Sequence, residues 1–117
     1  MTKQNIIKEK SYEFALDIIG IYKQLVNEQK EYVLSKQLLK SGTSIGANVQ
    51  EAMEGQSRAD FVHKLSIALK EARETQYWIS LIFDAGYLSG SREISTKCEE
   101  LIFIITAIIK KTKTHDL

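Results

Sequence analysis

Hydrophobic positions recur at helical spacing over four stretches of the chain, and short polar connections separate them. Within each stretch the apolar residues return every three or four positions, which is the period of one face of an α-helix. We therefore predict helices over residues 6–27, 32–55, 58–85 and 91–112. Four helices with short connections favour an all-α fold, an antiparallel up-down-up-down four-helix bundle that forms a single domain over residues 1–117.

Some of these predicted helices carry a second apolar face beside the one that forms the core. A solitary bundle would leave this second face in water, including the only tryptophan of the chain. Large exposed apolar surfaces on soluble proteins mark interfaces, and contact between identical copies is an economical way to cover them. The predicted interface residues are Tyr12, Leu16, Ile19, Ile67, Trp78, Leu81 and Phe103.

The second predicted helix contains a segment, residues 41–56, that is crowded with glycine, serine, threonine and alanine. Glycine, serine and threonine support a helix poorly, and each interior glycine costs about 1 kcal/mol relative to alanine. The segment therefore stays helical only if tertiary packing holds it, and its small side chains would let a neighbouring helix approach closely. Alternatively, residues 41–48 form a loop that splits the segment into two short helices.

Composition adds little to this picture but narrows the function classes. The chain has no proline, which favours long helices, and its net charge of +1 gives no overall polycation signal for nucleic acid or membrane. Cys98 is the only cysteine, so no internal disulfide can form and a cytoplasmic location is expected. Residues 1–10 lack the apolar core of a signal peptide, and the longest apolar run is too short to span a bilayer.

Candidate catalytic chemistry is sparse. Glu51 and Glu71 suggest a carboxylate site inside the bundle, but a di-iron bundle needs two Glu-x-x-His motifs, and the two histidines of the chain do not supply them. No nucleophile-elbow or phosphate-loop sequence is present. We therefore predict no enzymatic activity, no cofactor and no metal. The two glutamates are expected to bond Asn48 or a nearby serine, or to pair with Arg73 or a lysine.

Two groups of motifs carry a family resemblance. The run Ser44-Ile45-Gly46-Ala47-Asn48-Val49-Gln50-Glu51-Ala52 is followed by Ser57, Phe61, Leu65, Ser66, Ile67, Ala68 and Glu71. The motif Gly86-Tyr87-Leu88-Ser89 precedes the last predicted helix. In order and spacing, over about residues 8–112, these motifs resemble the bacterial four-helix-bundle family of 23S rRNA intervening-sequence proteins. The structural motif residues are Ser44, Gly46, Asn48, Glu51 and Glu71.

The resemblance implies a left-handed bundle that assembles into a ring, often a pentamer, and that has no enzymatic activity. Some genes of this family lie in insertions within bacterial 23S rRNA genes. A related protein, the accessory variability protein of diversity-generating retroelements, is a pentameric bundle that binds nucleic acid and a reverse transcriptase. The partners that the resemblance implies are therefore further copies of the chain and RNA or DNA.

One end of the predicted bundle carries a small excess of positive charge. An up-down topology brings both termini and the second connection to this end, where eight basic residues face six acidic ones. In a five-fold ring the excess would repeat around one rim, to about +10, and weak phosphate contacts can add up in that way. Such lysines also simply solvate helix ends. The predicted nucleic-acid contacts are Lys3, Lys8, Lys10, Arg58, Lys64, Lys110, Lys111 and Lys113.

These observations predict a non-enzymatic, oligomeric bundle that acts as a nucleic-acid-binding or scaffolding module, with RNA as the favoured ligand. The alternative is a protein-interaction adaptor without nucleic-acid binding, in which exposed apolar residues such as Tyr12 or Phe103 dock a helix of another protein. An enzyme with a site around Glu51 and Glu71 is a third alternative. No membrane partner is expected.

Overall fold

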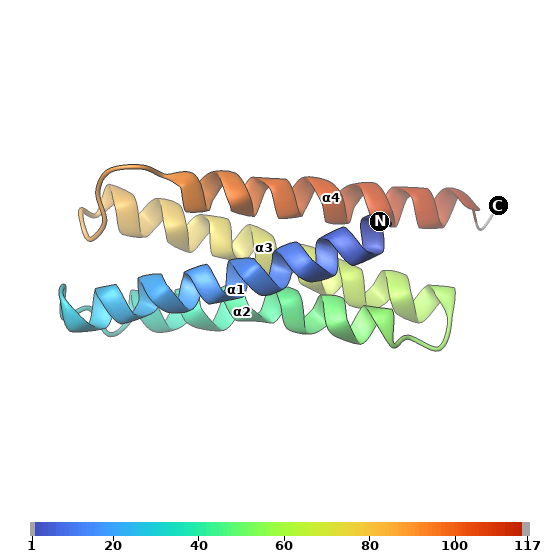
Figure 1. The fold of residues 1–117 in the computed structure, drawn as a ribbon, viewed down its shortest axis with the longest axis horizontal. Helices are drawn as coiled ribbons and strands as arrows, with labels where there is room; N and C mark the ends of the chain where they lie inside the picture. Colours follow the sequence, from blue (N-terminus) through green and yellow to red (C-terminus); the bar gives the residue numbers. More distant parts are fainter. Residues whose placement is uncertain (1, 116–117) are drawn as a thin grey trace.

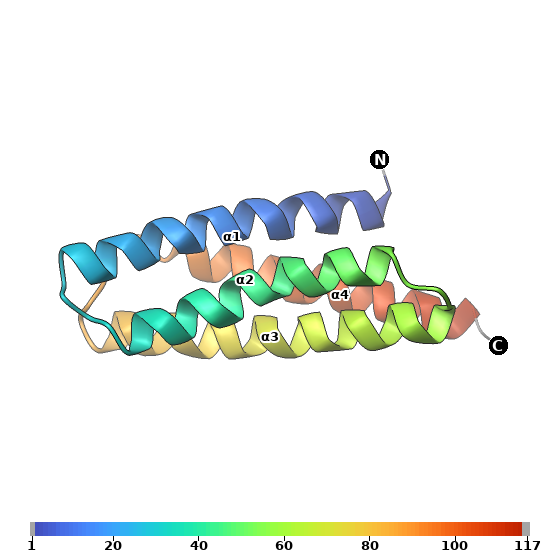
Figure 2. The same cartoon turned by 90° about the horizontal axis from the view of Figure 1, so that it is seen from below.

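A computed structural model describes residues 2–115, apart from the side chains of residues 3, 4 and 115. This part of the chain forms four helices, each antiparallel to the one before it (Figures 1 and 2). The all-α up-down-up-down bundle predicted from the sequence is confirmed. The helices are α1 (Lys3–Asn27), α2 (Leu34–Met53), α3 (Arg58–Asp84) and α4 (Glu93–His115).

The helix boundaries follow from local capping chemistry. The hydroxyl of Thr2 accepts a hydrogen bond from the backbone N–H of Asn5 and starts α1 ahead of the predicted residue 6. Ser57 caps α3 in the same way, with the N–H of Asp60 as donor at 3.0 Å. Gly86 has φ of 87° directly after α3, a left-handed conformation that glycine adopts without steric cost and that ends helices.

The four helices pack in a cycle, with α1 and α3 at opposite corners. In the described part of the chain each helix packs against its two neighbours and none packs across a diagonal. One stripe from every helix fills the centre, and Ile18, Leu38, Leu65 and Leu101 are fully buried there or nearly so. The resulting rod measures 50 × 22 × 21 Å, so most functional surface lies along its sides.

The segment rich in small residues is helical from residue 41 to the end of α2 at Met53, and the alternative of a loop over 41–48 is wrong. Here α2 lies unusually close to α1. A Cβ atom added to Gly42 would lie 2.9 Å from the Cγ1 and Cγ2 atoms of Ile18, and one added to Gly46 would lie 3.2 Å from the backbone oxygen of Ser11. Tertiary packing against α1 therefore compensates for the poor helix propensity of the segment.

The tryptophan does not lie on an exposed face, so that part of the sequence prediction is wrong. Trp78 is half-buried against the core, and its ring meets Tyr77 edge-on with 5.1 Å between centroids. Trp78 follows the buried Thr75 by three residues and precedes the buried Ile82 by four. It therefore lies at one edge of the buried stripe of α3. The predicted interface residues Ile67 and Leu81 are likewise half-buried.

The connection between α1 and α2 contains a capping carboxylate. Lys30 turns the chain with φ of 56°, and Glu31 folds back over the start of α2. The Glu31 carboxylate accepts hydrogen bonds from the backbone N–H groups of Val33, Leu34 and Ser35 at 3.1, 3.0 and 2.7 Å. Burial acts to raise the pKa of this carboxyl, but the backbone donors outweigh burial and hold the pKa below its ordinary value.

Alanine at Gly42 is expected to lower the free energy of unfolding by about 1–3 kcal/mol, because overpacking against the fully buried Ile18 outweighs the gain in helix propensity. Gly20→Ala is the matched control, since a Cβ atom there meets nothing within 4 Å. That control should gain up to about 1 kcal/mol. Urea denaturation followed by circular dichroism measures both changes, and equal effects of the two variants would contradict the close contact.

Glu31→Gln is expected to lower the free energy of unfolding by about 1 kcal/mol at pH 7, a typical cost for losing a helix cap. Because the folded-state pKa is lowered, the stabilisation is present above the ordinary value of 4.5 and is lost as pH falls through the folded-state value. The difference between wild type and variant should therefore shrink below about pH 4. Denaturation at pH 7 and pH 3 tests this, with the exposed Glu28→Gln as control; a difference that does not depend on pH would refute it.

Candidate functional site

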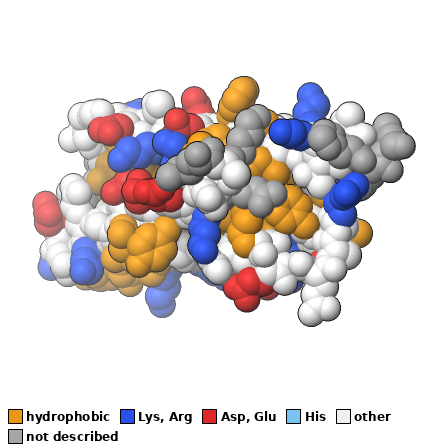
Figure 3. Space-filling model, turned by 45° about the vertical axis from the view of Figure 1, so that its right-hand side comes forward, with side chains coloured by type: hydrophobic (Ala, Val, Ile, Leu, Met, Phe, Trp, Pro, Cys, Tyr) orange, Lys and Arg blue, Asp and Glu red, His pale blue; other side chains and the backbone are white. Residues whose placement is uncertain are grey.

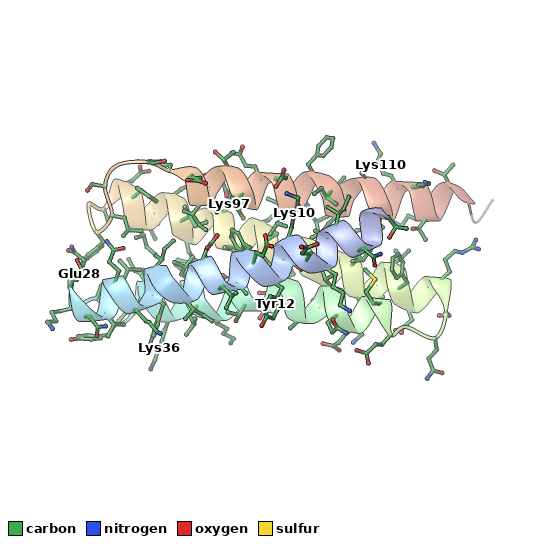
Figure 4. The ribbon with its side chains drawn as sticks, in the orientation of Figure 1. Lys10, Tyr12, Glu28, Lys36, Lys97 and Lys110 are labelled. Atoms are coloured by element: carbon green, nitrogen blue, oxygen red, sulfur yellow. The ribbon has the colours of Figure 1, made fainter. Side chains whose placement is uncertain are left out.

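The end of the bundle that holds both chain termini presents a group of exposed lysines. The start of α1, the α2–α3 connection and the end of α4 meet at this end (Figures 1 and 2). Lys8, Lys110, Lys111 and Lys113 are all exposed there. Figure 4 shows Lys110 toward this end of the rod and Lys36 toward the other. We call Lys8, Lys110, Lys111 and Lys113 the lysine end.

Other residues predicted to contact nucleic acid have different surroundings. The ammonium group of Lys10 lies 3.1 Å from a carboxylate oxygen of Glu100, and that of Lys64 lies 3.1 Å from one of Glu51. Each of these charges is offset by a carboxylate. Arg58 is exposed at the first position of α3, and the side chain of Lys3 lies outside the described residues.

A broad apolar groove follows the outer seam between α1 and α2. Its volume is about 1020 Å³, and small residues of α2 lie in it beside large residues of α1. Tyr12 is 67% exposed and Leu16 is 54% exposed, whereas Ile19 is half-buried. The apolar members of this α1/α2 groove are Tyr12, Ala15, Leu16, Ile19, Gly46 and Ala47.

A second apolar surface lies on α4. Phe103 is 75% exposed, the largest value among the exposed large hydrophobic side chains of the described residues. We call Ile102, Phe103, Thr106 and Ala107 the α4 patch, and it lies between Glu99 and Lys110. In the space-filling view, hydrophobic side chains gather in patches between charged ones (Figure 3). The α4 patch and the α1/α2 groove have the character of interaction surfaces.

The two motif carboxylates have different surroundings. Glu51 is exposed and engaged by Lys64, whereas Glu71 is half-buried and its neighbours include Glu74 and Lys40. Burial, and then the negative charge of Glu74, raise the pKa of Glu71. The exposed Glu51 is therefore paired with a lysine, whereas the half-buried Glu71 lies among charges of both signs.

The polar motif residues of α2 bond their own helix. The hydroxyl of Ser44 donates to the carbonyl oxygen of Lys40 at 2.6 Å, and the side-chain amide of Asn48 donates to the carbonyl oxygen of Ser44 at 2.8 Å. Deeper in the bundle, the hydroxyl of Thr75 lies 2.9 Å from that of Ser41. These side-chain donors are engaged by the backbone of α2 or by each other inside the fold.

The single cysteine lies in the interior and is not a reactive thiol. Cys98 is fully buried, and burial raises the pKa of its thiol to about 12, so the thiol stays protonated. Its sulfur lies 3.2 Å from the carbonyl oxygen of Ala72. Within the described part of the chain, no three His, Cys, Asp or Glu residues gather as a metal site, and no helix combines the length and apolar character needed to cross a membrane.

Two features of the structure were not predicted from the sequence. Tyr77 is 60% exposed on the outer face of α3, next to the half-buried Trp78. The period of α3 gave a signal for this, because Tyr77 lies about 160° from the buried Thr75, two positions earlier in the chain. Glu31 lies in a polar run where nothing in the residue types marks a cap, since glutamate is not a preferred capping residue.

Comparison with known proteins agrees with the fold and with the motifs of α2 and α3. The family described as 23S rRNA-intervening sequence protein matches residues 3–107. A crystal structure of a protein of unknown function from the S23 ribosomal protein family of Bacteroides thetaiotaomicron is 53% identical, with a TM-score of 0.89. The match covers 93% of this chain and 99% of that one. No curated protein matches the chain. The chain belongs to the family of 23S rRNA-intervening sequence proteins.

Proposed function

We propose that this protein is a non-enzymatic, self-associating bundle that binds structured nucleic acid, RNA foremost, through its lysine end. The observation that carries the proposal is the exposure of Lys110, Lys111 and Lys113 on the last turns of α4, with Lys8 on the first turns of α1. Several lysines on one end of a rod can each neutralise a phosphate and release its counterions. A nearly neutral chain gains in this way a local positive field.

Self-association strengthens such a weak site. A few phosphate contacts per chain give little affinity, but copies that present their lysine ends together bind one ligand several times over. The exposed apolar surfaces along the sides of the rod supply a reason for copies to join, and the family resemblance implies five copies in a ring. We place this assembly in the cytoplasm, where an unpaired thiol such as Cys98 is normal.

The α1/α2 groove favours a second candidate function, an adaptor that docks a helix of another protein without binding nucleic acid. Apolar contacts are not screened by salt, whereas lysine–phosphate contacts weaken steeply as salt rises. A specific protein complex that survives high salt, together with no retention of nucleic acid at low salt, would favour the adaptor.

Replacing Lys111 and Lys113 together by glutamine should weaken binding of an RNA hairpin by roughly tenfold at low salt. The slope of log affinity against log salt should become shallower by about two, since two phosphate contacts are lost. Fluorescence anisotropy over a salt series measures both quantities, with a DNA duplex of equal length as a second ligand.

The matched control replaces Lys36 and Lys40, exposed lysines in the half of the rod away from the termini, by glutamine. This variant changes net charge equally and should keep near wild-type affinity. An equal loss in both double variants would mean that only net charge matters. Wild-type protein that binds neither ligand at low salt would end the nucleic-acid part of the proposal.

A further inference from the structure

Two apolar surfaces of the rod lie on opposite sides and remain uncovered within one chain. Lys97 and Glu100 of α4 pair with α1, so their side of α4 faces α1. The amide of Gln76 on α3 reaches Ser95 at 2.7 Å and approaches Glu99 at 3.4 Å, so that side faces α3. Phe103 follows Glu99 by one turn and therefore lies toward α3, whereas the groove lies between α1 and α2.

One surface presents an exposed aromatic ring and the other has room for it. Phe103, at 75% exposed, is the ring of the α4 patch. The α1/α2 groove is concave, and Gly46 and Ala47 leave room in it beside Tyr12 and Leu16. An aromatic ring that enters a groove lined by small residues loses much of its contact with water, which is the usual character of an interface anchor.

The charges around the two surfaces also match when the helices run antiparallel. Along the outer stripe of α1, Glu9 precedes the apolar residues and Lys23 follows them, about 21 Å apart. Along α4, Glu99 precedes the α4 patch and Lys110 follows it, about 17 Å apart. With Phe103 opposite Leu16, an antiparallel α4 brings Lys110 near Glu9 and Glu99 toward Lys23. The small Ala107 then lies opposite the large Tyr12.

On the basis of the self-association proposed above, we propose that the α1/α2 groove of one copy receives the α4 patch of a second copy, with α4 antiparallel to α1. The contact is head-to-tail, so each copy uses both surfaces, one toward each neighbour. A two-fold contact of groove with groove would cover one surface and leave Phe103 of both copies in water. A single head-to-tail contact covers both surfaces, which is why we favour it.

A mixing experiment tests the head-to-tail contact. Leu16→Glu places a negative charge only in the α1/α2 groove, and Phe103→Glu places one only in the α4 patch. Both side chains are exposed, so helicity should persist in circular dichroism. Each variant alone should run as a 13.3 kDa monomer in light scattering while wild type is larger. Mixed one to one, they should form a dimer, because each partner keeps the surface that the other lacks. Tyr77→Glu, an exposed aromatic outside both surfaces, should keep the wild-type mass.

Each result separates this inference from the proposed function. Monomeric wild type would end self-association altogether, and this inference with it. If wild type is oligomeric and Phe103→Glu keeps its mass, the head-to-tail contact is wrong while self-association stands, and groove-to-groove pairing or another contact takes its place. If both variants are monomers but the mixture gives no dimer, the pairing of these two surfaces is likewise refuted.

A charge exchange tests the antiparallel direction. Glu9→Lys and Lys110→Glu should each raise the dissociation constant between copies by roughly fivefold, since exposed ion pairs contribute modestly. The chain with both substitutions should regain most of the wild-type affinity, because the opposite charges meet again with their signs reversed. Sedimentation at low and high salt measures this, and losses that simply add in the double variant would contradict the assigned direction.

Discussion

The structure depends on the close approach of α1 and α2. Gly42 lies under the side chain of Ile18, and Gly46 lies under the backbone of Ser11, where a Cβ atom would crowd its neighbour. Side chains that weaken an isolated helix are therefore what allow these two helices to meet. The same segment shapes the outside of the seam, because Gly46 and Ala47 also line the α1/α2 groove. One stretch of small residues thus sets both the interior contact and the exterior surface.

The interior of the bundle is occupied by packing and offers little chemistry. The buried hydroxyls of Ser41 and Thr75 bond each other, and the single thiol is held protonated by burial. The motif carboxylates Glu51 and Glu71 lie toward the surface with different neighbours. What distinguishes this rod from any stable bundle is therefore its exterior, namely a lysine end and two apolar sides.

These exterior surfaces are compatible with one another. Lys8 lines the α1/α2 groove and Lys110 borders the α4 patch, whereas Lys111 and Lys113 belong to neither surface, so contacts between copies leave Lys111 and Lys113 open. Figures 1 and 4 show the end of the rod that holds the chain termini, with Lys110 toward it. Side-by-side association of copies that point the same way gathers their lysine ends on one face. Binding of a polyanion and association of copies would then support each other, since each added copy raises the local number of phosphate contacts.

The number and approximate extent of the helices follow from the amino-acid pattern alone, because the 3.6-residue period and the absence of proline leave few alternatives. The sequence also determined that residues 41–56 need close packing, and the motifs around Asn48 and Glu71 indicated the family. The sequence did not determine which residues beside the core stripe of each helix are exposed. Trp78 and Phe103 both lie off their core stripes, yet one is half-buried and the other is 75% exposed. This difference arises from the packing of the bundle, because the exposure of a residue beside the core stripe depends on the distance and rotation of the neighbouring helix. The period of the sequence does not contain that information.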